Sequence, residues 1–387
     1  MTQRATVAII GGGAIGASIA WHLASSGVDN IVVIDQAAGP GQGSTGKATG
    51  GYRAQFGTAV NVQLSLLSRS KLLEFERMTG IDPGYQQVGY LWLASTDMQL
   101  AALRSARSVQ HAEGLAEARD VSPEEIAALN PLVDTNGIVG GAFCPTDGYI
   151  RPLEILRGYQ TAAERLGVRF VWRNQCTRLD LDDSGRVTRV TTPFESYAID
   201  SVVNAAGAWA AGIADLAGVD LPVTPLKRQA AFTVPCPAIP PDMPMTIFMG
   251  SGFHIRARDG RALLSWPGPE VHGEPDELSA DPAWIDTVSA MARRYVPMLS
   301  DVQIDTGLAY AGLYEISPDH HAILGVFPEI PNLYFANGSS GHGVMHSPAI
   351  GDVIASMITG REPPVDVTIL RPSRFREGQA VTGPELL

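Results

Sequence analysis

The sequence predicts an α/β fold in which a nucleotide-binding βαβ unit is combined with a second, strand-rich region. Residues 6–35 carry the first signal, because they read as a strand, a glycine turn, a helix and a second strand. Short strands between residues 227 and 314 carry the second signal, and they look antiparallel. A strand that runs into a glycine-rich turn and a helix at residues 333–358 carries the third.

The N-terminal stretch has the pattern of a dinucleotide-binding turn. A buried strand at Val7–Ile10 runs into a Gly-x-Gly-x-x-Gly motif that opens a helix. Gly11 permits the tight turn, Gly13 lets the backbone approach a pyrophosphate, and Gly16 lets the helix pack on the strand. The second strand ends at Asp35, where a carboxylate accepts hydrogen bonds from ribose hydroxyls. A turn that serves only the fold is the alternative.

Two further stretches are rich in small residues. Residues 39–53, GPGQGSTGKATGGYR, contain six glycines and three Ser or Thr side chains, so they either line a cofactor or form a flexible loop. Residues 201–209, SVVNAAGAW, read as a strand that ends in small residues. Either a large ligand approaches the backbone there, or a helix packs closely on the strand.

The turn at residues 338–343, GSSGHG, presents a second helix N-terminus, with Pro348 expected in the first turn of that helix. Two such termini at opposite ends of the chain favour an extended dinucleotide with an electron-rich second end. The pyrimidine edge of a flavin, which is negative when reduced, fits this arrangement.

The remaining elements follow from periodicity and capping signals. Helices are predicted at residues 61–78, 96–113, from 123, at 152–166 and at 283–296. Strands are predicted at residues 87–94, 140–144, 168–172, 176–181, 187–191, 227–234, 253–257, 262–266 and 306–314, with a proline-rich loop at 235–244.

Composition limits the function classes. The 387 residues are 45% hydrophobic and 18% charged, as in an ordinary globular protein with a substantial core. A net charge of −12 argues against nucleic acid as a partner. We expect neither a signal peptide nor a membrane span, because apolar runs stay below about 18 residues. Cys144, Cys176 and Cys236 are far apart, which favours buried thiols in a cytoplasmic protein over a disulfide or a metal site.

Five motifs, in order, resemble the D-amino-acid oxidase superfamily of FAD enzymes, in the branch of sarcosine oxidases, glycine oxidase and proline dehydrogenase β subunits. They are GGGAIGASIAWHLASSG, GSTGKATGGYR, VVNAAGAW, AGLYEISPDHHAILG and NGSSGHGVMHSPAIG, and they cover almost the whole chain. The resemblance implies a Rossmann-like FAD-binding domain, at residues 1–85, 150–220 and 325–387. It would be interleaved with an α+β substrate domain, at residues 86–149 and 221–324, containing a mixed, largely antiparallel sheet.

The resemblance also implies which residues contact FAD. The ADP half, the phosphates and the flavin ring would be held by Gly11, Gly13, Ala14, Ile15, Gly16, Asp35, Gln36, Ser44, Thr45, Gly50, Gly51, Cys176 (through its backbone), Ala206, Gly207, Trp209, Gly312, Ser340, Gly341, His342, Gly343, Val344 and Met345. Arg53 matches the family arginine beside the flavin ring.

The departures from the family are informative. Monomeric sarcosine oxidases tether FAD through a cysteine, and Gly312 stands at the matching position, so FAD should be non-covalent. Met345 replaces their lysine for the substrate carboxylate, and Leu264 replaces, by a looser alignment, their oxygen-activating lysine. The carboxylate arginine of glycine oxidase falls on Tyr314. Either other residues of this chain therefore bind a substrate carboxylate, or the chain does not recognise one.

The candidates for chemistry are cations and an aromatic ring. A substrate carboxylate requires a cation, and Arg53, Arg256, His254 and His346 are available. Strand alternation places His254 and Arg256 on one face with Arg258, and that face either lines a pocket or meets solvent. His342 has either a catalytic or a structural role. Tyr314 either faces the substrate or belongs to the core.

The expected function is oxidation of the C–N bond of a small amino acid or of a secondary amine, whether N-methyl, N-alkyl or cyclic, to an imine by hydride transfer to flavin N5. The acceptor is O2, a quinone or an electron-carrier protein. The residue at Leu264 favours a dehydrogenase, or the flavin subunit of a hetero-oligomeric enzyme, over a fast oxidase. The alternative is a non-catalytic, FAD-stabilised assembly or interaction factor.

Overall fold

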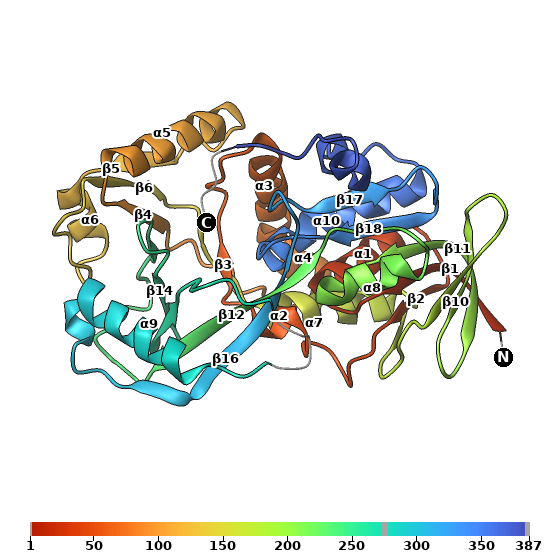
Figure 1. Ribbon diagram of the computed structural model, residues 1–387, viewed down its shortest axis with the longest axis horizontal. Coiled ribbons are helices and arrows are strands. Elements are labelled where there is room, and N and C mark those ends of the chain that lie inside the picture. Colours follow the sequence, from red (N-terminus) through yellow and green to blue (C-terminus); the bar gives the residue numbers. More distant parts are fainter. Residues whose placement is uncertain (1, 273–277, 384–387) are drawn as a thin grey trace.

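Two large sheets organise the molecule, and they lie in opposite halves of it (Figure 1). The computed structural model describes residues 2–272 and 278–383. The predicted domain ranges also include residues 1, 273–277 and 384–387, which lie outside the described residues. The predicted α/β class is confirmed, and so is a mixed, largely antiparallel second sheet.

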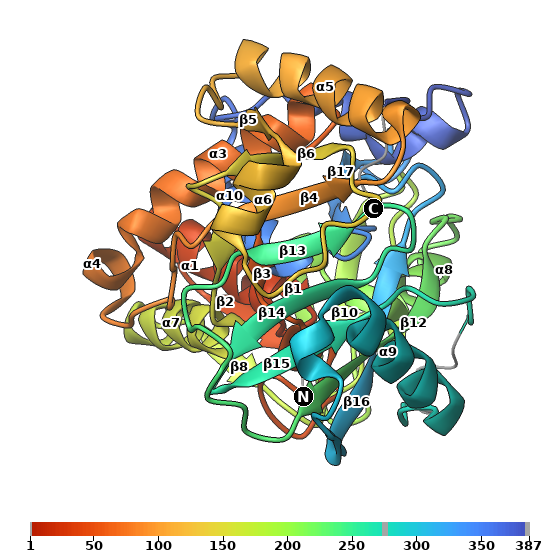
Figure 2. The ribbon, with the colours of Figure 1, turned by 90° about the vertical axis from the view of Figure 1, so that its left-hand side faces the viewer.

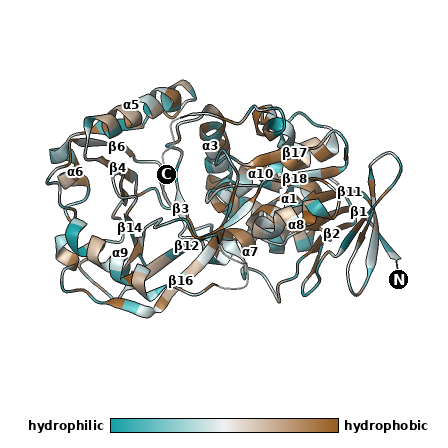
Figure 3. Ribbon diagram, viewed as in Figure 1, coloured by the Kyte–Doolittle hydropathy of each residue, from teal (hydrophilic) through white to brown (hydrophobic). Residues whose placement is uncertain are grey.

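The first sheet has the order β17-β18-β11-β1-β2-β8, and its central strands are parallel. Its strands are β1 (Thr2–Ile10), β2 (Ile31–Ile34), β8 (Arg169–Val171), β9 (Arg178–Leu181), β10 (Val187–Thr191), β11 (Ser196–Asn204), β17 (Ile323–Val326) and β18 (Leu333–Asn337). β9 and β10 form an antiparallel pair beside β11. Parallel strands buried on both faces explain the apolar runs in β1 and β2, which are brown in Figure 3.

Helices α1 (Ala14–Ser25) and α10 (Gly343–Thr359) pack together on one face of this sheet. Their backbones lie close, because a Cβ at Gly351 would lie 2.1 Å from the Ser18 hydroxyl oxygen. The other helices of this half are α2 (Ser44–Lys47), α3 (Ala59–Leu73), α4 (Phe75–Thr79), α7 (Pro152–Arg165) and α8 (Ala210–Asp215). Close contact between α1 and α10 brings the two predicted glycine turns to the same end of the sheet.

The second sheet has the order β16-β12-β15-β14-β13-β4-β6-β5, and Figure 2 looks onto it. Its strands are β4 (Tyr90–Ala94), β5 (Arg119–Val121), β6 (Gly140–Cys144), β12 (Thr224–Thr233), β13 (Met245–Phe248), β14 (His254–Arg258), β15 (Arg261–Ser265) and β16 (Ile304–Ile316). Helices α6 (Pro123–Leu129) and α9 (Pro282–Tyr295) cover its outer face. The inner face is turned toward the first sheet.

A short pair of strands, β3 (Gly51–Tyr52) and β7 (Gly148–Tyr149), lies between the halves. Helix α5 (Asp97–Ala112) packs beside β4. The 3₁₀ helices are Gly207–Trp209, Pro297–Leu299, Thr368–Leu370 and Pro372–Phe375. No helix in the described ranges is both long and apolar enough to cross a bilayer.

Several predicted elements need correction. The helix expected at 61–78 is two helices that meet at Glu74. Pro348 lies beyond the first turn of α10, because that helix begins at Gly343. The proline has no N–H to donate to the carbonyl of Val344, and the Ser347 hydroxyl donates to that oxygen instead at 2.8 Å. The strand predicted from residue 201 begins earlier, at Ser196, and it ends at Asn204, where the small residues begin.

Candidate functional site

The three glycines of the N-terminal motif have different neighbours. Gly11 has a φ of +109°, and a Cβ there would lie 2.2 Å from the carbonyl oxygen of Ala205. A Cβ at Gly16 would lie 1.9 Å from the carbonyl oxygen of Gly11. A Cβ at Gly13 would meet only the Thr45 hydroxyl, at 3.2 Å. The protein's own packing therefore requires Gly11 and Gly16, whereas Gly13 borders space that the protein leaves open.

The first turn of α1 offers amides to an anion. The Thr45 hydroxyl accepts from the amide of Ala14 at 3.1 Å. The amides of Ile15 and Gly16 have no acceptor within the described part of the chain. Asp35 lies beside this turn, and its carboxylate accepts from the amides of Gly12 and Ala37, both at 2.7 Å. Backbone donors of this kind are what a pyrophosphate requires.

The other residues that the resemblance assigns to the ADP half are distributed around this turn. Gln36 is exposed beside Asp35, and Ser44 begins α2. Cys176 is buried in the core below the first sheet. After β11, Gly207 adopts a φ of +55° with open space around it. The half-buried Ala206 and Trp209 flank that glycine.

The second glycine turn leads into α10 and touches the second sheet. The amide of Ser340 donates to the carbonyl of Glu315 at 3.1 Å. Gly341 has a φ of +93°, and a Cβ there would lie 2.4 Å from the Tyr314 ring. His342 is the N-cap of α10, and Gly343, Val344 and Met345 form its uncharged first turn. The turn that leads into α10 therefore lies against the ring of Tyr314.

Strand register places the predicted chemical residues on the inner face of the second sheet. Directly paired residues share a face, and alternate residues along a strand do so too. By this register the residues of the inner face include Tyr90, Trp92, Leu226, Arg228, Ala230, Met245, Ile247, His254, Arg256, Arg258, Leu263, Ser265, Tyr310, Gly312 and Tyr314. Trp92 Nε1, Ser265 Oγ and Tyr310 Oη on this face are buried polar atoms without a protein partner among the described residues. Polar groups of this kind are expected to meet a ligand or water.

Arg53 and His342 form the centre of the site. The buried Arg53 guanidinium lies 4.1 Å from the ring centroid of Phe56 and 5.0 Å from that of Trp92. One of its nitrogens lies 3.1 Å from His342 Nε2. A guanidinium only donates, so Nε2 accepts and His342 is neutral. Burial and the charge of Arg53 lower the pKa of His342 well below its usual value.

Asp147, just before β7, holds this centre in place. Its fully buried carboxylate accepts from the amide of Ala54 at 2.7 Å and from the Gln55 side chain at 3.1 Å. Burial raises the pKa of Asp147 to about 6, against the effect of these hydrogen bonds. The acid fixes the backbone immediately after Arg53.

Arg256 and His346 are engaged in structural contacts. Arg256 is buried, stacks 3.7 Å from the centroid of Tyr149, and donates to the carbonyls of Thr49 and Gly50 at 2.8 and 2.7 Å. Burial lowers its pKa to about 10. A Cβ at Gly50 would lie 2.5 Å from a backbone oxygen, and one at the neighbouring Gly51 would lie 3.0 Å from the Tyr90 hydroxyl. Arg256 therefore stabilises the glycine-rich loop.

His346 is buried between α3 and α10, where its Nε2 lies 2.8 Å from the Ser65 hydroxyl. Burial lowers its pKa to about 3.

His254, Arg228 and Tyr314 complete the inner face. His254 Nδ1 donates to the carbonyl of Gly252 at 3.0 Å, and burial together with the charges of Arg53 and Arg228 lowers its pKa. Arg228 lies 5.8 Å from the centroid of Tyr314. Burial raises the pKa of Tyr314, so its hydroxyl stays protonated. The site therefore has two guanidinium charges and two neutral histidines.

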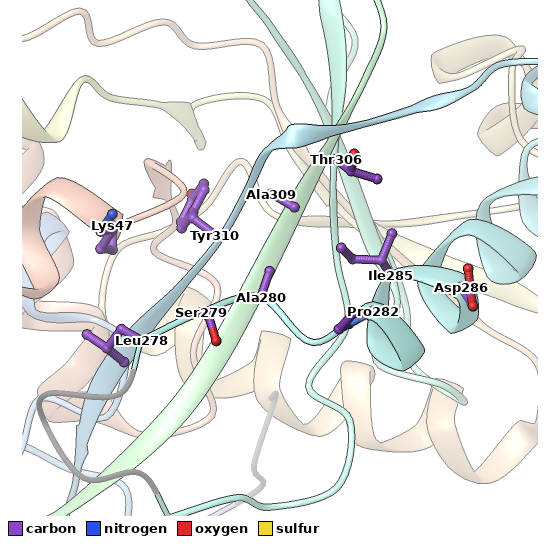
Figure 4. A pocket seen from close by; sticks show the side chains of 10 residues that line it. All are labelled: Lys47, Leu278, Ser279, Ala280, Pro282, Ile285, Asp286, Thr306, Ala309 and Tyr310. Carbon is purple, nitrogen blue, oxygen red and sulfur yellow. The ribbon is translucent and has the colours of Figure 1, made fainter.

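A cavity of about 500 Å³ lies at the edge of the second sheet, outside this group (Figure 4). Its lining includes Lys47, Ser279, Asp286 and Tyr310. Lys47 Nζ lies 5.7 Å from the centroid of Tyr310, and a Cβ at Gly312 would lie 2.7 Å from Lys47 Cβ. Lys47 therefore packs over Gly312.

These residues fit FAD. Two helix N-termini, one open at Gly13 and one uncharged at Gly343, meet the requirements of a pyrophosphate and of an electron-rich ring. The unpartnered polar atoms of Trp92 and Ser265 lie on the face opposite them. A dinucleotide with one end at each terminus matches this arrangement.

Comparison with known proteins agrees with this geometry. The model of the DAO family, described as FAD dependent oxidoreductase, matches residues 6–357. FAD-dependent oxidoreductase domain-containing protein 1 of Xenopus laevis is 29% identical over 92% of this chain and 79% of its own length. Mitochondrial dimethylglycine dehydrogenase of Mus musculus is 28% identical over 96% of this chain, which spans only 44% of that protein.

Solved structures give the same result. The L-proline dehydrogenase from P. horikoshii has a TM-score of 0.90 and 27% identity, over 98% of this chain and 99% of its own. Glycine oxidase from Geobacillus kaustophilus has a TM-score of 0.84 at 24% identity, over 96% of this chain and 99% of its own, which shows a shared fold. The family resemblance found in the sequence is confirmed.

Proposed function

The chain belongs to the DAO family of FAD-dependent oxidoreductases, and from this premise we propose that it oxidises the C–N bond of a small amino acid or a secondary amine to an imine. Relatives named for dimethylglycine, 4-methylaminobutanoate and glycine support this substrate class. The observation that carries the proposal is the convergence of Arg53, His342, His254, Arg228 and Tyr314 between the second helix N-terminus and the inner face.

The residues of the two turns would hold FAD, with the first turn of α1 at the pyrophosphate and the first turn of α10 at the flavin ring. When bound, FAD accepts a hydride from the carbon beside the amine nitrogen, and water then hydrolyses the imine to a carbonyl compound and an amine. An acceptor, which is O2, a quinone or an electron-carrier protein, finally removes two electrons and closes the cycle.

The protein's own contribution is to bind an uncharged amine and to position it. Only the neutral amine has the nitrogen lone pair that forms the C=N bond. The charges of Arg53 and Arg228 lower the pKa of His254, and they act in the same direction on a bound ammonium group. Arg53 holds His342 neutral, with its lone pair on Nε2. A proton taken up at Nε2 would break the contact with Arg53 and would create a buried charge. The site therefore favours a substrate that enters as the free amine.

Anaerobic mixing tests the proposed function. The purified yellow protein is combined with a panel of N-methyl, N,N-dimethyl and cyclic amino acids, and the flavin absorbance near 450 nm is followed. Bleaching by any member supports the enzyme. A flavin that only dithionite reduces would instead support the second candidate, a non-catalytic assembly or interaction factor.

A further proposal concerns location and partners. We propose a cytoplasmic protein that works either alone or as the flavin subunit of a hetero-oligomeric dehydrogenase. Leu264, matched loosely to a lysine of the relatives, lies in the outer-face core with Ile255 and Ala231 and so does not face the flavin. Its neighbour on the inner face is Ser265 and not a lysine, which supports the dehydrogenase over an oxidase. Steady-state assays with O2 and with an artificial quinone, compared at equal substrate concentration, separate the two.

We predict that the flavin is released completely on denaturation. A thioether needs a thiolate beside the ring, and Gly312 supplies none. His342 and His346 are held by Arg53 and Ser65, so neither ring is free to form a histidyl linkage. Acid precipitation should leave a colourless pellet and all the FAD in the supernatant. Flavin mass on the precipitated chain would disprove non-covalent binding.

A further inference from the structure

We propose that Arg228 binds the carboxylate of the substrate, which makes carboxylated amines the preferred substrate class; this inference rests on the proposed amine oxidation. Arg228 lies on β12, opposite Gly312 of β16. Its guanidinium lies 5.8 Å from the centroid of Tyr314, the ring that touches the second glycine turn. The arginine therefore faces the same space as the residues at the predicted flavin ring.

Arg256 and Arg53, the two arginines considered above, already have acceptors. Arg256 donates to the carbonyls of Thr49, Gly50 and Ala257. Arg53 donates to the carbonyl of Gln55 and to His342, and its flat faces lie near Phe56 and Trp92. If Arg256 bound a substrate instead, it would release the glycine-rich loop. If Arg53 did so, its contact with His342 would be lost.

The histidines considered from the sequence are also unsuitable as anion anchors. His254 and His346 are kept neutral by burial and by neighbouring charge, and the pKa of His346 falls to about 3. A neutral imidazole offers one hydrogen bond and no charge to a carboxylate. His346 is also already engaged, because its Nε2 lies 2.8 Å from the Ser65 hydroxyl.

Arg228 is different because its hydrogen bonds are weak and no acid in the described part of the chain forms an ion pair with it. Its only hydrogen bonds within the described residues go to the carbonyls of Lys227 and Pro267, at 3.4 and 3.3 Å, and it forms no ion pair there. It is half-buried, and burial lowers its pKa, partly offset by Tyr314 and Glu270. A carboxylate would satisfy this guanidinium with two parallel, charge-assisted hydrogen bonds.

The position also explains how this chain compensates for its departures from the family. The two carboxylate cations of the relatives match Met345 and Tyr314, which are uncharged. Arg228 lies beside Tyr314 on the adjacent strand, so the positive charge is restored about one strand spacing away. The substrate would then bind with its carboxylate toward β12 and its amine toward Arg53 and His342.

Binding of pyrrole-2-carboxylate, a planar acid that cannot be oxidised as an amine, tests the proposal on FAD-loaded protein. Isothermal titration compares it with the uncharged pyrrole-2-carboxamide. In Arg228→Met the Kd of the acid should rise about ten- to a hundredfold, since a charged hydrogen-bond pair is lost, while that of the amide changes little. Arg228→Lys should restore part of the affinity.

Arg293→Met is the matched control, because Arg293 is exposed on α9, which covers the outer face of the same sheet, and it contacts the Ser289 hydroxyl at 3.0 Å. It removes one positive charge and should leave both Kd values near wild type. Three results would each overturn the proposal. Arg228→Met could bind the acid as tightly as wild type does, or it could lose equal affinity for the acid and the amide. The wild-type protein could also fail to bind the acid. Strong acid binding that depends on Arg228, combined with a flavin that no amine bleaches, would support this anion site while refuting the proposed oxidation.

Discussion

Replacement of Gly13 by valine should yield a folded protein without FAD. The space around a Cβ at this position contains only the Thr45 hydroxyl, 3.2 Å away, and Gly13 has an ordinary φ of −76°. The chain itself therefore tolerates a side chain, whereas the pyrophosphate that the turn is built to bind does not. We expect loss of nearly all the 450 nm absorbance, with a far-UV circular dichroism spectrum like that of wild-type apoprotein.

Gly16→Val is the control that distinguishes ligand exclusion from misfolding. Its Cβ would lie 1.9 Å from a backbone oxygen of the same turn, so this variant should fail to fold or unfold at much lower temperature. A yellow Gly13→Val protein would show that the pyrophosphate does not bind at this turn. Equal damage from both substitutions would show that Gly13 also serves the fold.

Replacement of Arg374 by methionine should destabilise the protein by about 3–5 kcal/mol, the range for a buried ion pair that loses one partner. The side chains of Arg374 and Asp319 are 0% and 3% exposed, and two guanidinium nitrogens bind the carboxylate at 2.8 Å each. Arg374 also donates to the carbonyls of Leu370 and His321. Urea unfolding, followed by fluorescence, should show a large fall in the midpoint.

The exposed pair Arg4–Asp200 provides the comparison. Its side chains are 69% and 52% exposed, so Arg4→Met should change stability by only about 0–1 kcal/mol. A small effect at Arg374, similar to that at Arg4, would contradict the assignment of a strong buried pair.

The same pair predicts a dependence of stability on pH. Burial alone would raise the pKa of Asp319, but the hydrogen bonds and charge of Arg374 outweigh it and lower the pKa. The unfolded chain therefore binds a proton at higher pH than the folded chain. The contribution of the pair is complete above the unfolded pKa of about 3.9 and is lost as the pH falls through the lower folded value. In Arg374→Met this acid-dependent part should be reduced.

Local patterns identified the segments that meet around the two glycine turns, for physical reasons. The turn at Gly11–Gly16 and the acid at Asp35 are neighbours through one short βαβ unit, so their spacing along the chain sets their spacing in the fold. The loop at 39–53 and the turn at 338–343 were recognised from composition for the same reason. The register of the second sheet could not be obtained in this way.

The chemical half depends on which strands lie side by side. Arg228 was overlooked because only the pairing of β12 with β16 brings it to Gly312 and Tyr314. Asp147 was also overlooked, because its role appears only where β7 meets β3 and brings its carboxylate to the amide of Ala54. Alternation had left open whether the face of Arg256 meets solvent, and the structure buries Arg256 against Tyr149. Strand alternation predicts which side chains share a face of a sheet, but it does not predict which other part of the protein covers that face.

The order of strands in the first sheet also has a consequence during synthesis on the ribosome. β1 pairs with β11 on one side, so Thr2 meets Ser196, and β11 in turn needs β18 at Leu333. At about 5–20 residues per second, the N-terminal βαβ unit waits roughly 10–30 s before its central neighbour has been made. During that interval the apolar edge of β1 is unpaired, and an unpaired edge of this kind favours aggregation of the nascent chain. The nucleotide-binding turn is thus the earliest part of the site to be translated and among the last to be completed.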